Sequence, residues 1–123
     1  MIYRFSLILI FMTQMTTGQV NWIDYDSEEA KKVSELTDRP YLVYYSLDGC
    51  SACEVTSKYF DLYSIYINRF YYPLKINCTE DECEEVNTYP RVEIMSNDGN
   101  NKITIEGYMT SGFVLSAITQ IHD

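Results

Sequence analysis

The sequence predicts one α/β domain: a mixed β-sheet with helices on both of its faces. In the first two thirds of the chain, apolar runs typical of strands alternate with segments of helical periodicity, which favours parallel strands joined by right-handed crossovers. Residues 91–95 and 102–108 then alternate in polarity around a segment rich in turn residues, which predicts an antiparallel hairpin. With 123 residues, the chain has room for a single core of ordinary size. The expected element order is β-α-β-α-β-α-β-β-α.

The amino-terminal half contains the first strand, the first helix and the central strand of this sheet. Residues 20–25 are typical of a short edge strand. Ser27, followed by two glutamates, predicts a helix that runs to about residue 37 and is stopped before Pro40. Residues 41–47 are almost all aromatic, β-branched or aliphatic, which predicts a central strand buried on both faces.

The carboxyl-terminal half completes the sheet and its helices. Residues 51–70 contain no glycine or proline and carry apolar side chains at helical spacing, so we expect one long helix there. Residues 74–77 predict a second central strand, and the acidic segment 79–86 predicts a short helix. The final helix carries an apolar stripe from Phe113 to residue 121.

The first 18 residues predict a secretory signal peptide. Arg4 supplies a positive charge, residues 5–12 form an apolar run, and residues 16–18 are small, as at a cleavage site. A buried first strand or a membrane anchor is the alternative, but the run is shorter than the ~20 apolar residues that a bilayer span needs. We therefore expect residues 19–123 to form the mature domain, secreted or in the lumen of the endoplasmic reticulum, with no membrane anchor.

The charge balance argues against a nucleic-acid partner. The chain carries 9 Lys and Arg residues against 18 Asp and Glu residues, for a net charge of −9. Such a surface repels phosphate backbones, and no cluster of basic residues offsets that repulsion. We therefore expect no nucleic-acid partner.

Cys50 and Cys53 are the residues that point most directly to a chemistry. They follow the predicted central strand and begin the predicted long helix, so the sulfur of Cys50 would lie over free backbone N–H groups. That position stabilises a thiolate, and Cys53, one turn further on, would be partly buried. A redox-active dithiol, half of a zinc site and a structural disulfide are all compatible with this spacing.

Four segments in this order resemble the thioredoxin fold, and in particular a catalytic domain of a protein disulfide isomerase. They are the Gly-Cys-Ser-Ala-Cys segment at 49–53, Lys-Ile-Asn-Cys-Thr at 75–79, Tyr89-Pro90, and residues 107–113. The resemblance covers nearly all of residues 20–121. It implies the thioredoxin-like mixed sheet and a thiol–disulfide exchange activity.

The resemblance also implies roles for individual residues. Cys50 would be the nucleophile and Cys53 the resolving thiol. Pro90 would be a cis-proline that faces the cysteine pair, and the backbone of Tyr89 would pair with an extended substrate chain. Taken alone, Tyr89-Pro90 would more often be an ordinary trans turn.

The second pair of cysteines admits two interpretations. The resemblance implies a structural disulfide between Cys78 and Cys83, whereas a zinc site would join them to the first cysteine pair. Asn77 also begins an Asn-Cys-Thr sequence, which fits the acceptor pattern for N-glycosylation.

The sequence departs from the family pattern near the first pair. Gly49 stands where an aromatic residue is usual, and Tyr44 stands where the family usually carries a buried acid. Asp48 and Glu54 flank the pair, and their charges would raise the pKa of the thiols and oppose the helix dipole. We therefore expect the Cys50 thiol to react more slowly than that of a well-tuned isomerase.

These observations predict a thiol:disulfide oxidoreductase of the secretory pathway that acts on protein cysteines, with no bound cofactor or metal. Its partners would be cysteine-containing client proteins and a redox partner protein or glutathione. One alternative is a binding module of the same fold whose Cys50–Cys53 disulfide is only structural. Another is a zinc-stapled domain.

Overall fold

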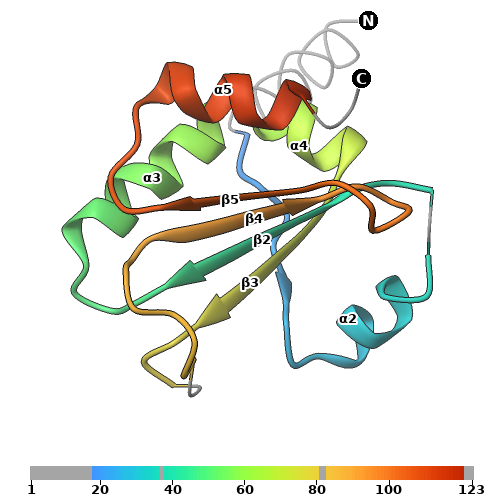
Figure 1. Cartoon of the computed structure of the whole chain (residues 1–123), viewed down its shortest axis with the longest axis horizontal. Coiled ribbons are helices and arrows are strands. Elements are labelled where there is room, and N and C mark those ends of the chain that lie inside the picture. Colours follow the sequence, from blue (N-terminus) through green and yellow to red (C-terminus); the bar gives the residue numbers. More distant parts are fainter. Residues whose placement is uncertain (1–17, 37, 81–82, 121–123) are drawn as a thin grey trace, which may run out of the picture.

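The computed structural model describes residues 18–36, 38–80 and 83–120. Apart from Gly18, the predicted signal peptide lies outside the described residues. The elements, in chain order, are β1 (Ile23–Asp24), α2 (Glu28–Val33), β2 (Tyr41–Ser46), α3 (Ser51–Leu62), α4 (Ser64–Phe70), β3 (Tyr72–Asn77), β4 (Arg91–Met95), β5 (Lys102–Glu106) and α5 (Ser111–Gln120) (Figure 1).

The five strands form one mixed sheet in the order β1-β3-β2-β4-β5. β2 lies at the centre, parallel to β3 and antiparallel to β4. β1 extends the parallel half on β3, and β5 pairs antiparallel with β4. The predicted combination of parallel crossover units with a closing antiparallel hairpin is therefore confirmed.

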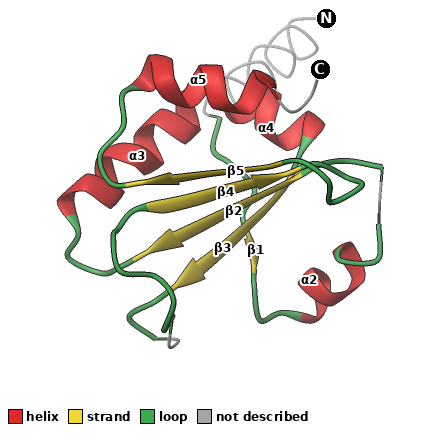
Figure 2. Ribbon diagram, in the orientation of Figure 1, coloured by secondary structure: helices red, strands yellow, loops and turns green. Residues whose placement is uncertain are grey.

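Helices cover both faces of the sheet, as predicted (Figure 2). α3, α4 and α5 lie on one face, and α2 lies on the other. None of the helices that the structure describes has the length and apolarity needed to span a membrane. The larger core lies under α3, α4 and α5 and contains Val20, Leu42, Tyr44, Phe60, Ile67, Tyr71, Val92, Ile94, Met109, Val114, Ala117 and Ile118.

α2 begins where the sequence predicts and ends earlier. Ser27 is its N-cap, and the Ser27 Oγ accepts a hydrogen bond from the backbone N–H of Ala30 over 3.1 Å. The helix ends at Val33, whose carbonyl accepts from the backbone N–H of Leu36 and from the hydroxyl of Tyr41, both at 2.9 Å. These bonds tighten the last turn and use the acceptor that a longer helix would need.

The predicted long helix is broken at Tyr63, so the prediction of one continuous helix is wrong at this position. Tyr63 has φ −107° and ψ 22° and separates α3 from α4. Its hydroxyl donates to the backbone carbonyl of Ser111 over 3.1 Å, which fixes this residue against the start of α5. The apolar periodicity survives the break because Phe60 and Ile67, on either side of it, enter the same core.

The helix predicted over residues 79–86 is also wrong. Of these, residues 79–80 and 84–85 form turns, residues 83 and 86 have no regular structure, and residues 81–82 are not described. A disulfide joins Cys78 to Cys83 and holds their Cα atoms 5.4 Å apart. Residues five apart in an α-helix are separated by about 8 to 9 Å, from the pitch and radius of the helix. The disulfide therefore excludes any helix that includes both Cys78 and Cys83.

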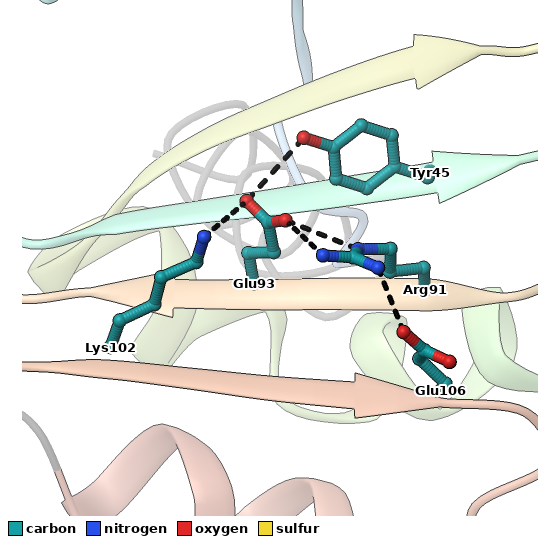
Figure 3. Close-up of polar contacts among 5 residues, drawn as sticks. All are labelled: Tyr45, Arg91, Glu93, Lys102 and Glu106. Atoms are coloured by element: carbon teal, nitrogen blue, oxygen red, sulfur yellow. Dashed lines mark hydrogen bonds and ion pairs between the residues drawn. The ribbon is translucent and has the colours of Figure 1, made fainter. Parts of the chain in front are cut away.

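On the face of the sheet that α2 covers, the part formed by β4 and β5 carries charged side chains (Figure 3). We call this network the β4–β5 ladder. Glu93, only 9% exposed, binds Arg91 at 2.9 Å and Lys102 at 3.6 Å, and Arg91 also binds Glu106 at 2.7 Å. The Tyr45 hydroxyl donates to Glu93 over 3.4 Å. Burial, followed by the Glu93 charge, raises the pKa of Tyr45 to about 12.

Candidate redox site

A disulfide between Cys50 and Cys53 lies at the N-terminus of α3. Cys50 is the N-cap, and its Sγ accepts a hydrogen bond of 3.1 Å from the backbone N–H of Cys53. Cys50 is half-buried, whereas Cys53 is only 4% exposed. The outer sulfur thus sits at the positive end of the helix dipole and the inner sulfur is enclosed, an arrangement that favours attack at Cys50.

Gly49 turns the chain from the central strand into α3. It has φ +73°, a left-handed conformation that side-chain-bearing residues adopt at a cost. A Cβ built at Gly49 would meet no atom within 4 Å, so the backbone conformation, not crowding, favours glycine here. The aromatic residue that the family pattern carries at this position would have to adopt that unfavourable conformation.

Pro90 lies at the same end of the central strands as the cysteine pair. It immediately precedes Arg91, which pairs with Tyr45 at the end of the central strand. Pro90 is fully buried, and its carbonyl accepts a hydrogen bond of 2.8 Å from the backbone N–H of Gly107. The Tyr89–Pro90 peptide bond is cis. The register therefore gathers the predicted nucleophile, the predicted docking residues and the loop that begins at Gly107.

Three residues hold the loop that precedes Cys50, in a set of contacts that we call the Asp48 latch. Asn77 Nδ2 donates to Asp48 Oδ1 over 3.1 Å, and the backbone N–H of Asp48 donates to Thr79 Oγ1 over 2.8 Å. The backbone N–H of Thr79 donates in turn to Asn77 Oδ1 over 3.0 Å. The Asp48 latch was not predicted from the sequence. The signal for it was that polar residues stand at the ends of two parallel strands, which meet at one end of the sheet.

The Cys78–Cys83 disulfide lies beside the Asp48 latch. Cys78 stands between Asn77, the last residue of β3, and Thr79, and its backbone N–H donates to the Ser46 carbonyl over 2.8 Å. The structure thus joins the four cysteines in two disulfides. Within the described ranges, no group of three or more His, Cys, Asp and Glu side chains is arranged to hold a metal ion. The glycosylation prediction at Asn77 stays a prediction.

The phenol of Tyr44 lies beneath the inner cysteine. Its hydroxyl donates to the Cys53 carbonyl over 2.7 Å and lies 3.1 Å from Ser57 Oγ. Burial raises the pKa of Tyr44, and the Ser57 hydrogen bond lowers it by less. Tyr44 is therefore neutral at physiological pH. The position where the family usually carries a buried acid holds an uncharged hydroxyl.

An open hollow of about 280 Å³ begins beyond Gly107 and is lined by Ile105, Glu106, Tyr108, Met109, Thr110 and Phe113. Two aromatic side chains on its wall are exposed, Tyr108 by 66% and Phe113 by 53%. The predicted apolar stripe of the final helix is wrong at Phe113, which faces solvent, and right at Val114, Ala117 and Ile118, which are buried. Residue 121 lies outside the described residues.

Comparisons with known proteins identify the fold but no sequence family. No family model matches the sequence, and no curated protein sequence is significantly similar to it. Among solved structures, chloroplastic thioredoxin z superposes with a TM-score of 0.68 at 17% identity, over 84% of this chain and 94% of that one. The chain has the thioredoxin fold.

Other thioredoxin-fold structures agree. Thioredoxin O2 from Arabidopsis thaliana, in the oxidized state, gives a TM-score of 0.60 at 17% identity over 83% of this chain and 95% of that one. The J-Trx1 fragment of ERdj5 gives 0.63 at 16% identity over 82% of this chain, which spans only 51% of that fragment. Identities this low show the fold alone. A thioredoxin fold with a CxxC disulfide at a helix N-terminus supports a module of the thiol–disulfide oxidoreductase type.

Proposed function

We propose that this protein is a thiol:disulfide oxidoreductase of the secretory pathway, similar to a catalytic domain of a protein disulfide isomerase, that acts on cysteines of client proteins. The observation that carries the proposal is the placement of the Cys50–Cys53 disulfide. Its outer sulfur caps α3, and its inner sulfur is enclosed against the sheet. This asymmetry gives the two cysteines different roles in exchange.

In the oxidising direction, a client thiolate attacks Sγ of Cys50. The Cys50–Cys53 bond breaks, Cys53 leaves as a thiolate and takes up a proton, and a mixed disulfide joins Cys50 to the client. A second client thiolate then attacks the client sulfur of that bond and expels the Cys50 thiolate. The client gains a disulfide and loses two electrons, which the protein holds as its dithiol. Reduction of a client runs through the same steps in reverse.

Two features support a client polypeptide as the substrate. Tyr89 is half-buried and lies at the edge of the sheet that carries Cys50, where its peptide group would pair with an extended client chain. The exposed aromatic rings of Tyr108 and Phe113 offer an apolar contact that is tolerant of client sequence. A redox partner protein or glutathione would restore the starting state.

The secretory location rests on two observations of different kinds. The sequence of residues 1–18 has the order of regions expected of a signal peptide. The four cysteines, paired as two disulfides, fit an oxidising compartment, since cytosolic thiols are normally kept reduced.

One observation favours a second candidate, a non-catalytic module that binds clients. Tyr44 supplies a neutral phenol where the family usually has a buried acid to move the proton of the second thiol. Slow proton transfer at Cys53 would leave binding as the main role.

Trapping of mixed disulfides tests the proposal. In a Cys53→Ser variant, the Cys50 thiolate attacks a client disulfide, but the complex cannot be resolved, so the reduced variant should accumulate covalent complexes with oxidised secretory proteins. A Cys50→Ser/Cys53→Ser variant is the matched control and should trap none. The wild-type protein should also catalyse reduction of a test disulfide. Absence of both trapping and catalysis would leave the binding module.

A further inference from the structure

Thr56, on α3, carries an unpaired hydroxyl inside the protein. The residue is 0% exposed, and its Oγ1 is the one buried side-chain nitrogen or oxygen without a hydrogen-bond partner in the part of the chain that the structure describes. Buried polar atoms are nearly always paired, because an unpaired one loses its bonds to water without replacement. This hydroxyl therefore requires an explanation.

Thr56 lies one helical turn after Cys53, on the same buried face of α3. Side chains three residues apart on a helix are neighbours, with Cβ atoms about 5 to 6 Å apart. Helical side chains also lean towards the N-terminus, so the side chain of Thr56 lies over the turn that carries Cys53. The hydroxyls of Tyr44 and Ser57 near this turn are engaged, since Tyr44 donates to the Cys53 carbonyl and lies within hydrogen-bond distance of Ser57.

We propose that the Thr56 hydroxyl donates a hydrogen bond to the Cys53 sulfur in the dithiol form and thereby sets the dithiol–disulfide equilibrium. This inference rests on the proposed function, in which the pair cycles between the two states. In the disulfide, the Cys53 sulfur is directed to Cys50 and Thr56 has no partner. Two electrons and two protons, supplied by glutathione or a client dithiol, open the bond. The freed sulfur then accepts from Thr56.

The consequence has a definite sign. The disulfide form carries the cost of the unpaired hydroxyl, and the dithiol form does not, so Thr56 shifts the equilibrium towards the dithiol and makes the pair more oxidising. The same bond stabilises Cys53 when it leaves as a thiolate during attack on Cys50. Thr56 would thus stabilise the Cys53 thiolate by a hydrogen bond. The neutral phenol of Tyr44 cannot supply the charge that a buried acid would place near this sulfur.

The test is the equilibrium of the Cys50–Cys53 pair in a glutathione redox buffer, with dithiothreitol as the stronger reductant where glutathione is too weak. Thr56→Val keeps the shape and removes the hydroxyl, and it should shift the equilibrium constant about 10-fold towards the disulfide, which corresponds to about 30 mV for a two-electron couple. Thr119→Val, the same change on α5 where the hydroxyl bonds backbone carbonyls, should leave the constant unchanged.

A second pair of variants separates packing from hydrogen bonding. Thr56→Ser and Thr56→Ala both remove the methyl group and differ from each other by the hydroxyl alone. Thr56→Ser keeps the hydroxyl, so its equilibrium constant should stay within about 2-fold of the wild-type constant. Thr56→Ala lacks the hydroxyl, so its equilibrium constant should shift in the same direction as that of Thr56→Val. This comparison holds even where the valine variant fails to fold.

Stability measurements in both redox forms complete the test. Thr56→Val should raise the midpoint of thermal unfolding of the disulfide form and not that of the dithiol form. Equal gains in both forms, with an unchanged equilibrium constant, would overturn the proposal and make the hydroxyl a simple defect of the core. The equilibrium is measured without any client, so failure to trap clients would count against the proposed function and not against Thr56.

Discussion

The side-chain amide of Asn77 donates a hydrogen bond of 3.1 Å to the Asp48 carboxylate, two residues before Cys50. With the bond from Asp48 N–H to Thr79, this contact fixes an exposed negative charge in the loop that leads to the proposed nucleophile. A carboxylate near a thiolate disfavours the charged, reactive form of the sulfur. The Asp48 latch therefore holds that charge in the loop two residues before Cys50.

Replacement of the Asp48 carboxylate by a neutral group should make the Cys50 thiol react faster. Asp48→Asn keeps the shape and the acceptor of the Asp48 latch, and in the reduced protein it should raise the rate of Cys50 alkylation at pH 7 about 2- to 5-fold, as expected for a change of less than one pKa unit. Glu29→Gln, an exposed change of the same charge on α2, is the control. A rate unchanged by Asp48→Asn would mean that the helix terminus alone sets the reactivity of Cys50.

Removal of the second disulfide should cost modest stability. The bridge between Cys78 and Cys83 closes a loop of a few residues, for which the chain-entropy relation gives about 2 kcal/mol. Urea unfolding of a Cys78→Ser/Cys83→Ser variant under oxidising conditions should show a loss of that size. A loss above about 4 kcal/mol would show that the bridge stabilises more than its own loop.

Arg91 should contribute more to stability than an exposed ion pair. Arg91→Met leaves Glu93 mostly buried with only Lys102 and Tyr45 near it, so the free energy of unfolding should fall by about 2 kcal/mol. Lys31→Met is the matched control, because Lys31 pairs with Glu28 on the surface of α2, and its loss should stay within about 0.5 kcal/mol. Equal losses from the two variants would contradict a special role for the β4–β5 ladder.

Tyr45 should make the protein sensitive to alkali. Its pKa is raised from 10.0 to about 12 in the folded protein, so its contribution to stability is complete below pH 10 and is lost as pH rises towards 12. Over that interval the unfolded chain releases the phenol proton first. Tyr45→Phe removes this group, so the stability of the variant should fall less steeply between about pH 10 and 11.5. Parallel stability curves for the two proteins would count against the assignment.

Local signals in the sequence predicted those elements that local interactions determine. Ser27 begins α2 because its own side chain supplies the cap, and residues 42–44 of the apolar run are buried because β2 lies at the centre of the sheet. The break at Tyr63 was not predictable in this way. It coincides with a bond to Ser111, a residue 48 positions away in the chain.

In the candidate site, too, the features that depend on local sequence were predictable and those that depend on tertiary contacts were not. The cysteine spacing and Tyr89-Pro90 were visible as short sequence segments. The Asp48 latch and the unpaired hydroxyl of Thr56 were not, because both depend on which side chains the fold brings together. Residues 79–80 and 83–86, predicted to be helical, are not helical, and they lie in a segment that the Cys78–Cys83 disulfide ties back on itself.

The two outer strands of the sheet leave little room for further strand addition. β1 has only two residues, and β5 exposes Lys102, Thr104 and Glu106 along its length. Short edges and charged edges both discourage the edge-to-edge pairing that leads to aggregation. A protein whose proposed partners are extended client chains must resist co-aggregation with them. The charged outer strand would therefore limit edge-to-edge pairing with those proposed clients.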